Sequence, residues 1–100
     1  MLLAVWNLQE DAYAVAIQQR LLELTGETWS FGSIYVSLER MTDRELVSSE
    51  LGEPSAERGG RAKRIYSLTT AGRASLVAIR ELQNHVWASV SVSRLKSGLA

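Results

Sequence analysis

Cysteine is absent from this 100-residue chain, and proline and histidine occur once each. Without cysteine there is no disulfide framework, no thiolate metal site and no thiol nucleophile, and the reducing cytoplasm is the expected compartment. No run of about 18 apolar residues is present that would span a membrane. The apolar start of the chain has neither a basic segment nor a small-residue cleavage site, so we do not expect a signal peptide.

Groups that converge for catalysis are scarce as well. The single histidine, His85, has no cysteine partner, and Asp43, Glu45 and Glu50 are spread over a predicted helix end and a strand. No ligand spacing typical of a metal site occurs, and the segment RGGRAKR lacks the Lys-Ser/Thr ending of a nucleotide-binding phosphate loop. We therefore expect no enzyme, no metal and no cofactor.

Net charge is also lacking, because 11 basic residues balance 11 acidic ones. A neutral chain is poorly suited to coating polyanions without specificity, but the distribution of charge matters more than its sum. Residues 39–57 hold six acidic side chains and two arginines, whereas residues 58–64 hold four basic side chains and no acid. The basic residues are therefore concentrated in one short segment.

The apolar pattern predicts three helices in the first half of the chain. The first covers residues 2–8, the second runs from an N-cap at Asp11 to a C-cap at Gly26, and the third is capped by Ser30. The positions expected to be buried recur at intervals of three and four: Ala14, Ile17, Leu21 and Leu24 in the second helix, and Phe31, Ile34, Leu38 and Met41 in the third.

The second half predicts a β-hairpin and a last helix. The runs ELVSSEL and AKRIYSL contain β-branched and aromatic residues and flank GEPSAERGG, which predicts two strands with a long tip. Thr69 is expected to cap the last helix, and the end, ASVSVSRLKSGLA, loses helical periodicity and is expected to fray. The fold class is α+β and mostly helical, in the order of a winged helix-turn-helix with an added C-terminal helix.

The outer face of the third helix suits the major groove of DNA. Opposite the buried stripe, this face is small near its N-terminus and basic near its C-terminus. Small side chains let the backbone approach base edges, serine can donate or accept, and free N–H groups suit a phosphate. The residues assigned to this contact are Ser30, Gly32, Ser33, Val36, Ser37, Arg40 and Arg44, with Tyr35 near a phosphate. The alternative is an ordinary solvated face.

The basic segment lies at the predicted hairpin tip. Its cations repel one another unless an external anion is bound, and its two glycines let the tip follow a surface. Arginine suits a phosphate or a narrow minor groove, so we interpret the segment as a DNA-contacting wing. The wing residues are Arg58, Gly59, Gly60, Arg61, Lys63 and Arg64. Alternatively, these cations pair with Glu50, Glu53 and Glu57, each pair contributing only about 0–1 kcal/mol.

The last helix is apolar over more than one face, which is typical of a helix that meets a partner. Its apolar residues are Leu76, Ile79, Leu82, Val86, Trp87 and Val90. Trp6 lies on the first helix, the other element expected at a dimer interface. Trp6 and Trp87 either stack on a planar aromatic effector or simply pack in that interface. Trp29 is expected to anchor the core or the adjoining loop.

Over residues 2–87 the chain resembles the PadR-type transcriptional regulators. The resemblance rests on DAYAV, GSIYVSLERM, ELVSSELGE and ERGGRAKRIYSLTTAGRASL. Gly32, Tyr35 and Leu38 match the family pattern Gly-x-x-Tyr-x-x-Leu, and the family's Gly-Gly-Arg wing pattern is matched from Gly59 to Gly72. Two features depart from the family: Ala14 stands where glycine is usual, and the first helix usually begins several residues earlier.

The resemblance implies a homodimeric repressor of the compact branch of the family. The first and last helices would form the dimer, and the two third helices would read a pseudo-palindromic operator with half-sites about 34 Å apart. Many relatives sense small aromatic or drug-like molecules at the dimer interface. We thus expect a DNA-binding domain over residues 1–68, and a dimerisation helix with a frayed tail over residues 69–100.

Two other functions stay open. The first is a winged-helix module whose hairpin binds an acidic protein surface. The second is a dimer that sequesters a small molecule and binds DNA weakly. Dependence of binding on DNA sequence separates the repressor from both.

Overall fold

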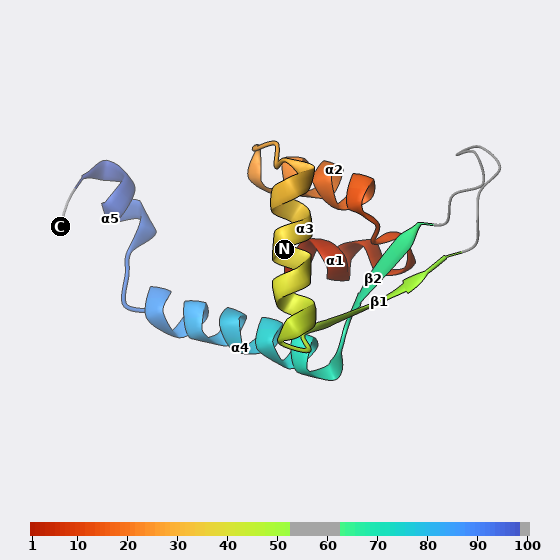
Figure 1. Ribbon diagram of the computed structural model, residues 1–100. Helices are drawn as coiled ribbons and strands as arrows, with labels where there is room; N and C mark the ends of the chain where they lie inside the picture. The colour runs from red at the N-terminus through yellow and green to blue at the C-terminus, as the bar shows by residue number, and fades with distance from the viewer. Residues whose placement is uncertain (53–62, 99–100) are drawn as a thin grey trace.

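The computed structural model describes residues 1–52 and 63–98. In chain order their elements are α1 (Leu2–Leu8), the 3-10 helix η1 (Gln9–Asp11), α2 (Ala14–Thr25), α3 (Phe31–Asp43), β1 (Val47–Leu51), β2 (Arg64–Leu68), α4 (Thr70–Trp87) and α5 (Val92–Ser97). Figure 1 shows α1, α2 and α3 gathered beside the hairpin, while α4 runs away from this body towards α5. The predicted α+β fold, mostly helical and with a hairpin after the third helix, is confirmed.

One apolar core joins the three N-terminal helices to the hairpin. Its buried members come from each of these elements and from the turn before α2: Ala4, Val5, Ala12, Ile17, Leu21, Ile34, Leu38, Val47 and Tyr66. Trp29 packs against this core, and its carbonyl accepts a hydrogen bond from Gln18 Nε2 at 2.7 Å. The shared core fixes α3 against the hairpin, so the two elements expected to touch DNA are held in one rigid unit.

Two residues of the predicted buried stripes are exposed instead. Phe31 is 42% exposed and Leu24 is 48% exposed, whereas Ile34 and Leu38 are fully buried. Phe31 begins α3, and Leu24 lies in the last turn of α2, so each lies at a helix end that the described elements leave exposed. Periodicity assigns a side chain to a face, but only contact with another element buries it.

Three of the predicted caps are confirmed. The Ser30 hydroxyl accepts a hydrogen bond from the Ser33 amide at 3.1 Å, and the Thr69 hydroxyl accepts one from the Gly72 amide at 3.0 Å. Gly26 ends α2 in the left-handed conformation, with a φ of 76°. Each cap satisfies backbone groups that the helix itself leaves unpaired.

The fourth predicted cap, at Asp11, is wrong. Asp11 ends η1, and α2 begins at Ala14 after Tyr13 in an extended conformation. The Ala12 carbonyl accepts a hydrogen bond from the Tyr66 amide at 2.8 Å, which holds this segment against β2. A tertiary hydrogen bond therefore delays the start of α2, although the side chain at Asp11 suits a cap.

The C-terminus of α3 is closed by a Schellman-type cap in which no glycine takes part. Glu45 has a φ of 60°, its amide donates to the Thr42 carbonyl at 2.9 Å, and the Leu46 amide donates to the Met41 carbonyl at 2.8 Å. Thr69 supports this cap, because its hydroxyl donates to the Glu45 carbonyl at 2.6 Å and its amide to the Leu46 carbonyl at 3.0 Å. The end of α3 is thus tied to the start of α4.

Gly72 is buried in the first turn of α4, against the same junction. A Cβ atom at Gly72 would overlap the carbonyl oxygen of Leu46. Only glycine therefore lets α4 begin this close to the connection between α3 and β1.

Beyond its first turns, α4 leaves the body of the protein (Figure 1). Every residue from 77 to 98 is exposed. The radius of gyration is 17.0 Å, compared with about 13 Å for a compact domain of this length. The chain does not fray after α4 as expected, because Ser91 caps α5 at its start and Gly98, with a φ of 78°, ends it.

Candidate nucleic-acid interface

α3 exposes the side predicted to contact DNA. Of the predicted contact residues, only Ser37 is half-buried. The others are exposed: Ser30, Gly32, Ser33, Tyr35, Val36, Arg40 and Arg44. Glu39 and Asp43 are exposed on the same helix, and the sequence interpretation left them out. Their charges offset those of Arg40 and Arg44, so the C-terminal half of α3 contributes little net positive charge.

The two serines at the start of α3 bond to each other. Ser30 Oγ accepts from the Ser33 amide at 3.1 Å and donates to Ser33 Oγ at 2.9 Å. The hydroxyl proton of Ser30 is therefore engaged within the helix end, while the hydroxyl proton of Ser33 is left to donate elsewhere. Between them, Gly32 leaves open space: an added Cβ would meet only Ser30 Oγ, at 4.0 Å.

The described part of the predicted wing begins at Lys63, at the root of β2. Lys63 Nζ lies 4.2 Å from the centre of the Tyr13 ring, and Arg64 Nη1 donates to Ser49 Oγ at 3.0 Å. Both cations are thus oriented by neutral neighbours, and among the described residues neither forms an ion pair. The other predicted wing residues, Arg58, Gly59, Gly60 and Arg61, lie outside the described residues.

Of the three acidic residues that could pair with the wing cations, Glu50 lies within the described residues. Glu50 lies opposite Ile65, whereas Arg64 lies opposite Leu51. Because side chains alternate along a strand, Glu50 and Arg64 point to opposite faces of the sheet. Among the described residues, neither Lys63 nor Arg64 forms an ion pair with Glu50. The pairs that would involve Glu53 and Glu57 lie outside the described residues.

Two tyrosines join the hairpin root to α3. Burial raises the pKa of Tyr66 on β2; the charge of Arg64 opposes this rise, and Tyr35 on α3 adds to it. Tyr35 therefore lies close enough to Tyr66 for an electrostatic interaction. Ile34 and Leu38 of α3 are buried in one core with Val47 and Tyr66 of the hairpin, so α3 is held against the hairpin that carries Lys63 and Arg64.

A second candidate surface is the groove between α1 and α4, with a volume of about 830 Å³. Trp6, Leu76 and Ile79, all predicted interface residues, line it together with Met1, Leu2, Leu3 and Met41. The remaining predicted interface residues lie farther along the chain and are exposed: Leu82 (63%), Val86 (54%), Trp87 (51%) and Val90 (39%). Trp87 does not line this groove, so the protomer does not bring Trp6 and Trp87 together there.

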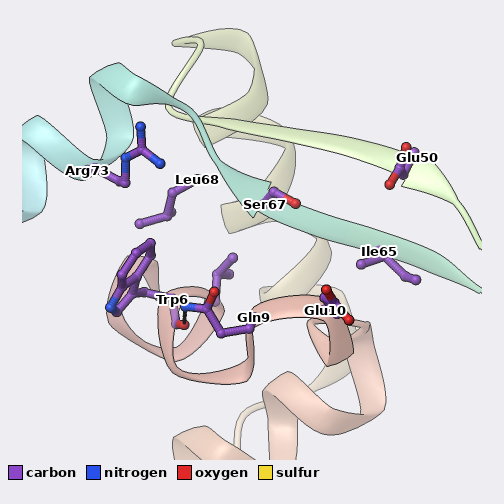
Figure 2. Close-up of a pocket in the computed structure, with 9 residues that line it drawn as sticks. Trp6, Gln9, Glu10, Glu50, Ile65, Ser67, Leu68 and Arg73 are labelled. Atoms are coloured by element: carbon purple, nitrogen blue, oxygen red, sulfur yellow. Dashed lines mark hydrogen bonds between the residues drawn. The ribbon is translucent and has the colours of Figure 1, made fainter.

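A smaller hollow of about 480 Å³ lies on the other side of Trp6, between α1, η1 and the hairpin. Figure 2 shows Trp6 and Arg73 at one end of it, and Glu10 and Glu50 at the other. The side chain of Gln9 donates to the Trp6 carbonyl at 2.5 Å. Opposite charges thus lie at opposite ends, and no ion pair among the described residues crosses the hollow.

In the part of the chain that the structure describes, the acidic residues and His85 do not assemble into a metal-binding group. Within residues 1–52 and 63–98, no three side chains of the metal-ligating types lie together. His85 is exposed on α4. No helix in this part of the chain is long and apolar enough to cross a membrane.

Comparison with solved structures supports the fold described above. A PadR-like transcriptional regulator from Bacillus cereus has a TM-score of 0.71 at 22% identity, covering 89% of this chain and 84% of that one. A PadR family transcription regulator from Clostridium difficile has a TM-score of 0.61 at 26% identity, covering 95% and 93%. A PadR-like transcription factor from Bacteroides fragilis has a TM-score of 0.57 at 28% identity, covering 85% and 86%.

Sequence comparison identifies the family directly. A search of curated proteins found no match. The sequence model of the PadR-like family of transcriptional regulators matches residues 2–78, which is most of the chain and includes α1 to α3, the hairpin and the start of α4. The family resemblance and the winged-helix fold predicted from the sequence are therefore confirmed, and this chain belongs to the PadR-like family of transcriptional regulators.

Proposed function

We propose that this chain is a homodimeric repressor that binds a pseudo-palindromic operator in double-stranded DNA. The observation that carries the proposal is that one core holds α3, whose outer face is exposed, against the hairpin that carries Lys63 and Arg64. The matching family is one of transcriptional regulators, and solved relatives are named as a transcription regulator and a transcription factor, which supports a role at DNA. The cytoplasm is the compartment that we expect for this role. Repression, rather than activation, follows the family likeness.

The roles within the interface divide between base edges and phosphates. The residues placed at or near base edges are Ser30, Gly32, Ser33, Val36, Ser37 and Arg40. Tyr35 and Arg44 are placed closer to the sugar-phosphate backbone of the DNA. The hairpin holds a phosphate or the minor groove through Arg58, Gly59, Gly60, Arg61, Lys63 and Arg64. Because Glu39 and Asp43 offset the arginines of α3, the hairpin supplies most of the salt-dependent affinity.

The dimer forms through α4 and the groove between α1 and α4. Leu82, Val86 and Trp87 are each more than half exposed on a helix that leaves the body of the protomer. An apolar helix surface of this kind is stable in water when a partner covers it. Residues 1–68 are then the DNA-binding domain and residues 69–100 the dimerisation segment, and the symmetry of the dimer matches that of the operator.

The decisive experiment is selection of duplexes from a random-sequence library by the full chain, followed by anisotropy titrations at two salt concentrations. We expect one pseudo-palindromic sequence to bind about 10³-fold or more above scrambled duplexes at moderate salt. Binding that ignores DNA sequence would favour the module that docks on acidic surfaces. Ligand affinity without operator affinity would favour the sequestering dimer.

The wing is tested with Arg61→Ala. A phosphate contact carries no sequence information, so this change should weaken all duplexes alike and reduce the salt dependence by about one unit of slope per contact. Arg40→Ala serves as the comparison, because a base contact should alter which sequences are preferred. Unchanged affinity and slope in Arg61→Ala would contradict the wing assignment.

A planar aromatic effector would bind in the groove between α1 and α4. The groove volume of about 830 Å³ lies within the range of about 300–1,000 Å³ usual for small-molecule pockets, and the Trp6 ring that lines it is 44% exposed. A bound ligand releases DNA only as far as it prefers the released state of the dimer.

This effector site is tested by tryptophan fluorescence with a varied panel of aromatic compounds. We expect binding to quench or shift the emission, because a stacked ligand changes the surroundings of the Trp6 ring. Trp6→Phe should abolish the change, and Trp29→Phe should retain it. If no compound changes the emission, the alternative of plain interface packing by Trp6 is favoured.

A further inference from the structure

Among residues 1–52 and 63–98, nothing packs against Gly32 in a way that requires glycine there. Its backbone is helical without a positive φ, and an added Cβ would meet only Ser30 Oγ at 4.0 Å. Glycine destabilises a helix relative to alanine, so this position carries a disadvantage that internal packing does not explain. Gly72 is the opposite case, because there the backbone of Leu46 occupies the space. No described residue other than Ser30 comes within 4 Å of this space, which leaves it open to a molecule outside the protomer.

The exposed side chains that follow this space on the surface of α3 are apolar. Tyr35 and Val36 follow Gly32 by three and four residues, so both adjoin it on the surface of α3. Tyr35 is 52% exposed and Val36 is 48% exposed. We call the gap left by the missing side chain at Gly32, together with the exposed Tyr35 and Val36 one turn further along α3, the notch. The missing side chain leaves room for about one methyl group.

Polar readout from this half of α3 is limited. Residues 31–38, FGSIYVSL, contain no amide, no basic and no acidic side chain. Ser30 donates its hydroxyl proton to Ser33 Oγ at 2.9 Å. The paired hydrogen bonds by which amides and arginine recognise purines are therefore not available here. The apolar group that a base pair presents in the major groove is the 5-methyl group of thymine.

We propose that the notch formed by Gly32, Tyr35 and Val36 recognises the 5-methyl group of a thymine in each operator half-site. This inference rests on the proposed function, since it requires α3 to enter the major groove. It adds the chemistry of the base that is read and makes Val36 and Gly32 determinants of specificity. The Tyr35 ring would flank the methyl group while its hydroxyl reaches a phosphate, as proposed above. Ser33 and Ser37 then supplement an apolar contact instead of supplying the main readout.

The test replaces thymine by deoxyuridine, position by position, in the duplex selected by the protein. Uracil pairs as thymine does and lacks only the methyl group. At one symmetric position we expect affinity to fall about fourfold per half-site, and about fifteenfold when both half-sites are changed, from the transfer free energy of one buried carbon group. Substitution at other thymines should leave affinity unchanged.

Two variants connect this effect to the notch. Val36→Ala should bind the thymine and uracil duplexes almost equally, because the methyl group loses its partner. Gly32→Ala should lose the same discrimination by filling the notch, while its thermal unfolding midpoint does not fall. Val92→Ala is the matched control, since Val92 on α5 has the same 48% exposure, and it should keep the full preference for thymine.

The results separate a failure of the methyl readout from a failure of the proposed function. If every uracil duplex binds as its thymine parent does, the methyl readout is overturned, while specific binding of the parent duplex still supports the repressor. If Val36→Ala keeps the preference for thymine, the notch is not the reader and the assignment is likewise overturned. If the selection yields no specific duplex, the proposed function fails and this inference fails with it.

Discussion

Replacing Gly72 with alanine should lower the free energy of unfolding by about 3 kcal/mol, the upper range for overpacking a well-packed site. The added Cβ would overlap the carbonyl oxygen of Leu46, a backbone atom that cannot rotate away as a side chain can. That carbonyl also accepts the Thr69 amide at 3.0 Å, so moving it breaks a second contact. The thermal midpoint should fall by roughly 12–24 °C for a chain of this length.

Circular dichroism during heating, at one fixed protein concentration, measures this change. Gly32→Ala is the matched control, because its Cβ meets open space on a helix, and it should raise stability by as much as about 1 kcal/mol. A Gly72→Ala protein as stable as the parent would mean that the connection between α3 and β1 moves freely. The tie between α3 and α4 would then be weaker than the contacts at Thr69 indicate.

Replacing Leu82 with glutamate should convert the proposed dimer into monomers at micromolar concentration. Leu82 is 63% exposed in the protomer and lies on the apolar side of α4. Removing an interface anchor typically weakens binding by about 2 kcal/mol or more, which is roughly a 30-fold rise in the dissociation constant. Because the proposed dimer is twofold symmetric, the substitution enters the interface from both protomers. Each new carboxylate would also lose its hydration without gaining a cationic partner.

Sedimentation velocity over a concentration series measures the dimer directly. Asn84→Glu adds the same charge two residues along, on the opposite side of α4, and should remain dimeric. Affinity for the full operator should fall sharply in Leu82→Glu, while affinity for a single half-site should change little. If both variants sediment as the parent does, α4 is not the dimer interface, and the apolar residues on it must serve another partner.

Much of the fold was predictable because its signals are local. A side-chain oxygen at Ser30 or Thr69 can reach an amide three residues ahead whatever the rest of the chain does. Gly26 takes a left-handed conformation that other residues avoid. The alternation of residue types around the hairpin and the concentration of cations near its tip are likewise properties of the sequence alone.

The predictions from the sequence were wrong where a contact between distant residues overrides a local preference. Asp11 has the chemistry of a cap, but the hydrogen bond from Tyr66 to Ala12 moves the helix start. Phe31 has the right spacing to be buried, but no other element covers that end of α3. Glu45 takes a φ of 60° because Thr69 and the end of α3 hold it there.

The sequence by itself determined the order of the elements, most of the helix caps, the basic segment and the family. The tertiary structure decided which faces stay open: the notch at Gly32, the groove beside Trp6 and the bare surface of α4. It also explained why Gly72 must be glycine. The physical reason is that exposure depends on what packs against a residue across the chain, and local spacing and propensity contain no record of those distant contacts.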